Sequence, residues 1–292
     1  MNTVCRKIDV HMHLAPAARA GGVPAATPAQ MLPHMRALGI RKALLMSSGE
    51  SAGTIPGGGN EACRIMARQD PDHFAWACNL DHRGSPRTVE ARLAACREQG
   101  AVAVGELILN LPVDDPFLQA VYAAAGKLGL PVTFHFSPAP GEGYGVVDAP
   151  GLPGLERMLA AYPGTVFVGH SCPFWAEISG DAPASPAGRS AWSSGPVRPG
   201  GQLPRLLARY PNLRADLSAN SGGCAILRDP AFGLDFLHRF AGQLLFGTDM
   251  SRVDQVFPLG GWLDGQAAAG TLPPQDYEAI CFGNAQRLYG LH

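Results

Sequence analysis

Short apolar stretches alternate along the whole chain with longer stretches whose apolar residues recur at helical spacing. The apolar stretches have the length of buried β-strands, and the longer ones that of surface helices. This pattern predicts strands over residues 7–14, 41–48, 74–80, 101–109, 130–137, 165–171, 213–219 and 243–250. It predicts helices over residues 28–38, 60–69, 85–99, 115–128, 152–162, 201–210, 229–240, 274–282 and 284–289, with a break near Gly283. Thr27, Asn60 and Ser85 stand where helix N-caps are expected.

Regular alternation of strand and helix predicts a parallel sheet, and eight units close a (β/α)8 TIM barrel. An open doubly wound sheet is the alternative, and it is disfavoured because no Gly-x-Gly-x-x-Gly motif follows the first strand. We therefore predict that residues 1–292 form a single α/β barrel domain. Two connections, residues 138–151 and 172–200, are unusually long and leave the carboxyl ends of strands, where the active sites of barrels lie.

Composition narrows the class of protein. The formal net charge of −1 offers no basic field for nucleic acid or for a membrane surface. The seven cysteines include no Cys-x-x-Cys pair, which favours reduced thiols in a cytoplasmic protein. The first residues lack the apolar core of a signal peptide, and no apolar run reaches the about 18 residues of a membrane span.

The first strand carries an unusual polar face. Side chains alternate along a strand, so Asp9, His11 and His13 are expected to point the same way, opposite Val10 and Met12. Two imidazoles two residues apart can bind one cation. A lone His-x-His is a weak signal, and a half-buried strand with a wet polar face is the alternative.

Four later strands each carry one polar residue in an apolar setting. In a closed barrel these residues converge with those of the first strand on one opening, and buried polar groups are costly unless they share a partner. A divalent cation is such a partner, and imidazole with carboxylate suits Zn²⁺ first and Mn²⁺, Fe²⁺ or Co²⁺ next, as one or two ions. The six candidate ligands are His11, His13, Glu106, His135, His170 and Asp249.

This set resembles the amidohydrolase superfamily, in particular its amidohydrolase-related (amidohydrolase 2) branch of metal-dependent TIM barrels, which includes aminocarboxymuconate-semialdehyde decarboxylase-like enzymes. The resemblance rests on Ile8-Asp9-Val10-His11-Met12-His13, Phe134-His135-Phe136, Gly169-His170-Ser171, Phe246-Gly247-Thr248-Asp249 and the stretch from Gly283 to Leu291. It implies that the metal ligands are His11, His13, His135 and Asp249. Relatives are often homodimers.

Two positions of this resemblance stay open. His170 is either a ligand of a second metal or a group that polarises the substrate. Glu106 stands where other members of the superfamily carry a carbamylated lysine. It either binds or bridges metal, or it orients a histidine ligand from outside.

The resemblance implies a metal-dependent hydrolase that cleaves a C–O or C–N bond of a small molecule, such as a lactone, ester or amide. Asp249 would be the base and His170 would stabilise the developing oxyanion. A decarboxylase or other lyase on the same site is the close alternative. A catalytically silent metal-binding or partner-binding barrel is the third reading, and the intact Asp249 argues against it.

Substrate contacts are expected from residues just after strands. Arg252 and Arg83 could bind a substrate carboxylate, although a surface role is at least as common for such residues. Tyr144 and Trp175 lie in the two long connections and could cover a ligand.

Overall fold

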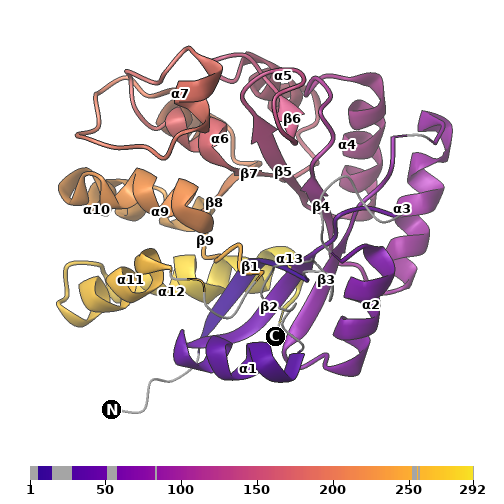
Figure 1. The fold of residues 1–292 in the computed structure, drawn as a ribbon, viewed down its shortest axis with the longest axis horizontal. Helices are drawn as coiled ribbons and strands as arrows, with labels where there is room; N and C mark the ends of the chain where they lie inside the picture. The colour runs from indigo at the N-terminus through magenta and orange to yellow at the C-terminus, as the bar shows by residue number, and fades with distance from the viewer. Residues whose placement is uncertain are drawn as a thin grey trace, which may run out of the picture.

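The strands of the protein form one parallel sheet that curves into a barrel (Figure 1). The computed structural model describes residues 6–14, 28–50, 58–82, 84–251, 255 and 257–291. Neighbouring strands follow one another in the order β1-β2-β3-β4-β5-β7-β8-β9, and β6 pairs with β5. The strands are β1 (Lys7–His13), β2 (Ile40–Met46), β3 (Phe74–Cys78), β4 (Ala103–Leu107), β5 (Val132–Ser137), β6 (Val146–Val147), β7 (Phe167–His170), β8 (Leu213–Asp216) and β9 (Leu244–Leu245).

The segment after β9 returns to β1 and closes the ring. Val10 N donates to Phe246 O at 3.0 Å, Asp249 N donates to His11 O at 2.7 Å, and His13 N donates to Met250 O at 2.9 Å. The predicted TIM barrel is confirmed. The predicted strand over residues 243–250 is wrong in extent, because only the two residues of β9 join the ladder of β8. Asp249 has a φ of 59°, which interrupts the extended backbone at that point.

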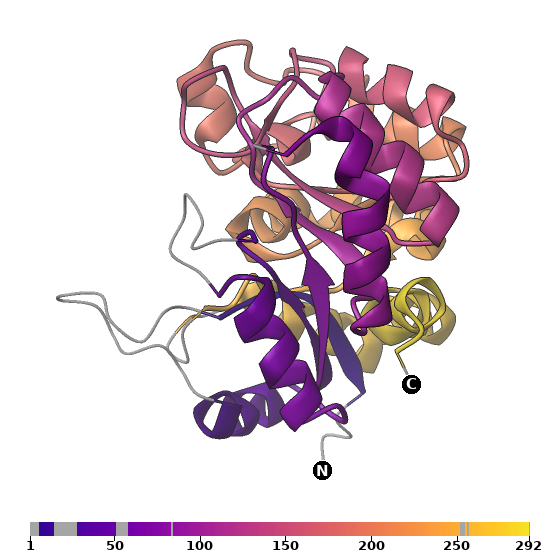
Figure 2. The ribbon, with the colours of Figure 1, turned by 90° about the vertical axis from the view of Figure 1, so that its right-hand side faces the viewer.

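Helices surround the strands, and α2, α3 and α4 form a layer on their outer face when the barrel is seen from the side (Figure 2). The α-helices are α1 (Pro28–Ala37), α2 (Asn60–Gln69), α3 (Val89–Glu98), α4 (Pro116–Leu128), α5 (Pro153–Ala161), α6 (Cys172–Ala176), α7 (Pro186–Ser190), α8 (Gln202–Arg209), α9 (Ala219–Leu227), α10 (Pro230–Arg239), α11 (Pro258–Ala268), α12 (Pro274–Glu278) and α13 (Asn284–Tyr289). Short 3₁₀ turns cover Pro86–Thr88 and Ala241–Gln243.

The inside of the barrel is filled by small and branched side chains from the strands. Ile8, Val10, Leu44 and Leu245 belong to one buried cluster, and Tyr289 of α13 joins it. The last helix therefore closes one end of the barrel, and the functional side chains are left to the other. The predicted break near Gly283 is instead a π-helical turn, Ala279–Gly283, that joins α12 to α13 without an interruption.

Outside the two long connections, two helices, α9 and α11, were not expected from the sequence. Both contain several glycines, each of which costs a helix about 1 kcal/mol relative to alanine. In α9 a Cβ on Gly222 would lie 2.5 Å from the backbone of Leu217, so the chain has no room for a larger residue at this position. The long connections also contain structure, since β6 lies within residues 138–151, and α6 and α7 lie within residues 172–200.

The predicted caps have mixed outcomes. Ser85 caps the 3₁₀ turn before α3 by accepting from Arg87 N. Asn60 is not a cap, because it is the first residue of α2 and its side chain binds elsewhere: Oδ1 accepts from Ser47 Oγ at 2.6 Å and from Asn79 N at 2.8 Å. Thr27 lies outside the described residues.

Candidate metal centre

Two imidazoles from β1 face each other at the centre of the barrel mouth. His11 is completely buried, and its Nε2 lies 3.1 Å from Nε2 of His13. The ladder between β1 and β2 is irregular between Asp9 and Met12. The bulged stretch keeps His11 and His13 together, as the alternation predicted.

Asp9 does not join these two histidines, although it was expected on the same face. Its Oδ1 accepts from the N–H groups of His11 (2.9 Å) and Thr248 (3.0 Å), and its Oδ2 accepts from Thr248 Oγ1 at 2.5 Å. Burial raises the pKa of Asp9 to about 7, against the opposing effect of the Thr248 hydrogen bond. Asp9 therefore ties β1 to the segment that carries Asp249.

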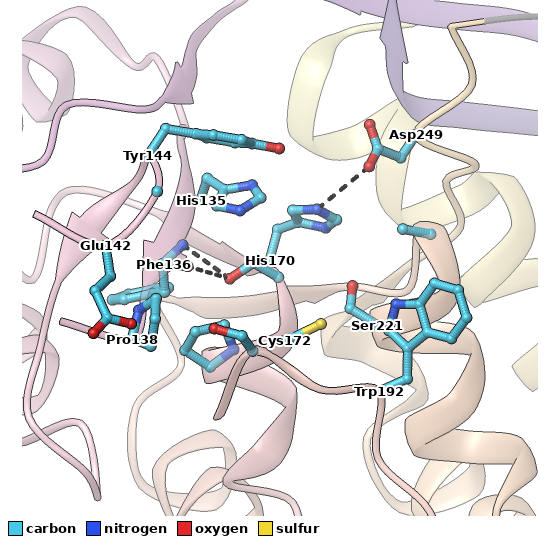
Figure 3. Close-up of a pocket in the computed structure, with 15 residues that line it drawn as sticks. His135, Phe136, Pro138, Glu142, Tyr144, His170, Cys172, Trp192, Ser221 and Asp249 are labelled. Carbon is cyan, nitrogen blue, oxygen red and sulfur yellow. Dashed lines mark hydrogen bonds and ion pairs between the residues drawn. The ribbon is translucent and has the colours of Figure 1, made fainter. Parts of the chain in front are cut away.

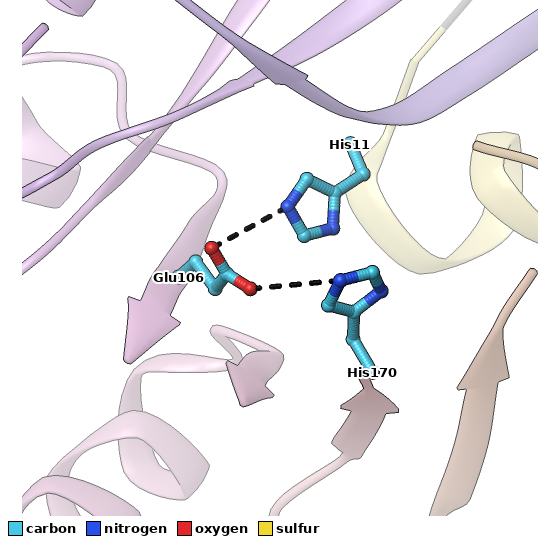
Figure 4. A group of neighbouring side chains, drawn as sticks. All are labelled: His11, Glu106 and His170. Carbon is cyan, nitrogen blue, oxygen red and sulfur yellow. Dashed lines mark ion pairs between the residues drawn. The ribbon is translucent and has the colours of Figure 1, made fainter. Parts of the chain in front are cut away.

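Glu106, at the end of β4, reaches the imidazoles of three other strands. Its Oε1 lies 2.8 Å from His135 Nδ1. Oε1 also lies 3.9 Å from His170 Nε2, and Oε2 lies 3.6 Å from His11 Nε2 (Figure 4). Oε2 is also 3.4 Å from His13 Nε2. The side chain is 3% exposed, so these imidazoles are its polar surroundings. Glu106 is thus at the centre of the cluster.

Asp249 completes the cluster from the segment after β9. Its Oδ1 lies 3.3 Å from His13 Nε2 and 3.6 Å from His11 Nε2, and its Oδ2 lies 3.8 Å from His170 Nε2. Its side chain is 29% exposed, more than the other acids of the cluster. Asp249 therefore connects the buried imidazoles with the space outside them. All six predicted residues meet at this one site.

Asp216, at the end of β8, is a member of the site that sequence reasoning missed. Its Oδ2 lies 2.6 Å from His11 Nδ1 and 3.4 Å from His170 Nδ1, and it accepts from Ser218 Oγ at 2.9 Å. Ser218 Oγ also lies 3.0 Å from His170 Nδ1. Asp216 thereby fixes the outer nitrogens of two histidines whose inner nitrogens face the cluster. The available signal was an acid inside a predicted strand, as at Glu106.

The geometry of the inner atoms fits a divalent cation. Ligand atoms at about 2.0–2.2 Å from a tetrahedral Zn²⁺ lie roughly 3.3–3.6 Å apart. The nitrogens of His11 and His13 are 3.1 Å apart, and each lies 3.3–3.6 Å from Glu106 Oε2 and Asp249 Oδ1. Two groups of three residues have ligand atoms close enough to share one ion: His11 with His13 and Asp249, and His11 with Glu106 and His170. Imidazole nitrogens with carboxylate oxygens form a donor set that Zn²⁺, Mn²⁺ or Fe²⁺ accepts.

The electrostatics of the cluster also favour a positive charge at its centre. Burial opposes the ionisation of Glu106, but the imidazoles of His11 and His135 outweigh it and hold the pKa of Glu106 well below its ordinary value. Burial likewise opposes the protonation of His13, but hydrogen bonds to Asp249 and Glu106 raise its pKa to about 9. The acids thus stay ionised and draw protons onto the imidazoles, a positive charge that a bound cation would replace.

A cavity of about 390 Å³ opens beside the cluster and is bordered by both long connections (Figure 3). Tyr144 comes from the first, with its ring 4.4 Å from that of His135. Cys172 and Trp192 come from the second, and the cavity also reaches His170 and Asp249. Tyr144 and Trp192 are 42% and 62% exposed. The cavity is the place where a small molecule could meet the cluster.

The other residues considered for substrate contact differ in their placement. The expectation for Trp175 is wrong, because this side chain is completely buried and its Nε1 donates to Asp216 O at 2.9 Å. It supports the site from behind instead of covering a ligand. Arg252 and Arg83 lie outside the described residues.

Comparison with known proteins agrees with this geometry. The sequence model of the amidohydrolase family (Amidohydro_2) matches residues 8–291. No protein of curated function matches the sequence. Over the described part of the chain, no helix is long and apolar enough to span a membrane.

Several solved structures share the fold at low sequence identity. A probable 2-pyrone-4,6-dicarboxylic acid hydrolase from Acinetobacter baumannii, with citric acid bound, is 16% identical with a TM-score of 0.62, over 99% of this chain and 100% of that one. A 2,6-dihydroxybenzoate decarboxylase in complex with 2,6-dihydroxybenzoate is 18% identical with a TM-score of 0.61, over 98% and 99%. A dihydroxybenzoic acid decarboxylase from a Polaromonas species, with manganese and 2-nitroresorcinol bound, is 16% identical with a TM-score of 0.60, over 100% and 98%.

Proposed function

The chain belongs to the amidohydrolase family, and on this basis we propose that it is a metal-dependent hydrolase that cleaves a C–O or C–N bond of a small molecule such as a lactone, ester or amide. One observation carries the proposal. Asp249 is the acid of the cluster that reaches the cavity, and its carboxylate lies within 3.8 Å of three imidazole nitrogens. Metal-dependent hydrolysis requires a base that reaches both the water at the cation site and the substrate in the cavity.

The residues that would hold an ion are His11, His13 and Asp249, whose ligand atoms all lie within 4.8 Å of one another, and His11, Glu106 and His170 form a second group of this kind. His135 meets the cluster through its contact with Glu106, and its direct coordination stays a prediction. When bound, a divalent cation supplies two kinds of chemistry: it lowers the pKa of water and polarises a carbonyl group.

Two side chains of the cavity would do the proton chemistry. Asp249 would take a proton from the attacking water and deliver it to the leaving oxygen or nitrogen. His170 would donate from Nε2 to the carbonyl oxygen as negative charge develops there, while Ser218 and Asp216 hold its Nδ1. The buried position of His170, 2% exposed, would keep water from competing for that hydrogen bond.

The first test is metal content. We expect about one or two equivalents of a transition metal in the purified protein, lost in His11→Ala and kept in His82→Ala, a matched histidine in an exposed turn. His170→Asn should keep the metal and lower kcat on a hydrolysed substrate roughly 100-fold. Full activity of Asp249→Asn would exclude Asp249 as the base, and a metal-free wild type, after growth with Zn²⁺ and Mn²⁺, would overturn the proposal.

Decarboxylation of a small carboxylic acid is the second candidate. It is supported by the similarity of the chain to two decarboxylases, one of which binds manganese. The two reactions differ in their products, so a screen of lactones, esters, amides and aromatic acids should follow both hydrolysis and CO2 release. The cytoplasmic location and the homodimer remain predictions from the sequence.

A further inference from the structure

The phenol of Tyr144 lies at the edge of the candidate metal centre, on the first long connection. Its ring packs against the imidazole of His135, with 4.4 Å between the two ring centroids. It borders the same cavity as His170 and Asp249, and Figure 3 shows its hydroxyl directed into that cavity, towards these two residues. Within the described part of the chain no group is hydrogen-bonded to this hydroxyl, so its proton is available to a ligand.

The loop that carries Tyr144 is held on both sides of that residue. Asn110 Oδ1 accepts from Gly141 N at 2.6 Å, and Asn110 Nδ2 donates to Gly145 O at 3.2 Å. Gly145 N donates to Ile108 O at 2.9 Å. A polar group on a loop fixed in this way needs little further ordering when a ligand binds.

The same loop approaches His135 at a distance that only a glycine permits. Gly145 has a φ of 113°, and a Cβ at this position would lie 2.6 Å from His135 O and 2.9 Å from Cδ2 of its ring. Gly145 therefore allows the backbone next to Tyr144 to lie against β5, and this places the phenol beside the imidazole.

We propose that Tyr144 is a catalytic residue whose hydroxyl donates a hydrogen bond to the carbonyl oxygen of the substrate, as a second donor beside His170, and that Asn110 is its positioning residue. The proposal rests on the proposed hydrolase function. When water attacks the carbonyl group, negative charge develops on the oxygen, and a donor that already points at this position stabilises it. A phenol keeps its proton at neutral pH, so it donates without giving the proton away.

The first test compares Tyr144→Phe, which removes only the hydroxyl, with Tyr210→Phe, a matched change at a hydroxyl that donates to Glu156 Oε1 outside the cavity. On a substrate that the wild type hydrolyses, Tyr144→Phe should lower kcat roughly 100-fold, with metal content and KM little changed. Tyr210→Phe should match the wild type.

Asn110 is tested by a double-mutant cycle. Asn110→Ala should lower kcat by a smaller factor than Tyr144→Phe does. The double variant should be no slower than Tyr144→Phe alone, because Asn110 acts through the phenol. Additive losses would show that Asn110 does not position Tyr144.

A binding measurement separates this inference from the proposed hydrolysis. Methylphosphonate presents anionic oxygens in a tetrahedral arrangement, as an attacked carbonyl group does, and its Kd for the metal-loaded protein can be measured by isothermal titration calorimetry. Tyr144→Phe should weaken this binding about tenfold, and Tyr210→Phe should leave it unchanged.

The two failures have different signatures. If the wild type hydrolyses a substrate and Tyr144→Phe keeps its kcat, the inference is wrong while the proposed function stands. If the wild type hydrolyses none of the screened compounds, the proposed function fails and the titration decides about the phenol. Equal Kd values for the wild type and Tyr144→Phe, or no binding to the wild type, would then overturn the inference.

Discussion

Replacement of Asp216 by asparagine tests whether the cluster is a metal centre that depends on its outer hydrogen bonds. Asp216 and His11 are both completely buried, and the 2.6 Å contact between Oδ2 and Nδ1 fixes which nitrogen of His11 faces the other ligands. Asparagine keeps the shape and one oxygen acceptor but removes the negative charge. Loss of such a supporting carboxylate costs about 10–100-fold in metal affinity, or about 1.4–2.7 kcal/mol.

The assay is a competition titration of Zn²⁺ or Mn²⁺ against a fluorescent chelator at fixed pH, for wild type and Asp216→Asn. The matched control is Asp276→Asn, which alters a similar pair, His238 Nδ1 to Asp276 Oδ2 at 2.5 Å, in which the histidine side chain is 66% exposed. We expect the control to bind metal as the wild type does. If Asp216→Asn folds, as judged by urea unfolding, and binds metal within about twofold of the control, His11 does not need Asp216 and the reasoning is refuted.

Three further predictions concern stability. A chelator should lower the melting temperature of metal-loaded protein by roughly 5–10 °C, because an ion at 100 times its Kd stabilises by about 2.7 kcal/mol, and added Zn²⁺ should restore it. Burial raises the pKa of Cys63 and of Cys281 from 9.0 to about 12, so the folded state keeps protons that the unfolded chain loses above pH 9.0. Above that pH, each thiol should therefore lower the free energy of unfolding by about 1.4 kcal/mol per pH unit. The midpoint of urea unfolding should fall less steeply with pH in Cys63→Ala than in the wild type, and equal slopes in the two proteins would contradict this explanation. Gly169→Ala should cost about 1–3 kcal/mol in urea unfolding, because its Cβ would lie 2.2 Å from the ring of Phe174, whereas Gly164→Ala, with no atom within 4 Å, should change stability by less than about 0.5 kcal/mol.

The order and type of most elements could be predicted from the sequence because a parallel strand covered on both faces reads as a continuous apolar run. A polar residue in such a run is then conspicuous, which is how His135, His170 and Glu106 were found. Asp216 lies in a predicted strand that also carries the charged Arg214. Pattern alone does not tell an acid that binds a histidine from one that faces solvent. The distance of 2.6 Å between Asp216 Oδ2 and His11 Nδ1 joins residues 205 positions apart, which is a tertiary fact.

The sequence by itself determined the barrel and the six polar residues at its mouth. The apolar pattern of a buried strand is a local property of the chain, and its alternation with helices can be counted eight times along the sequence. The tertiary structure alone decided how those residues are supported. It turned Asp9 towards Thr248, buried Trp175 behind Asp216, and formed α9 from a glycine-rich segment. Each of these outcomes depends on which distant group completes a hydrogen bond or fills a space, and that choice exists only after the strands have closed into a ring.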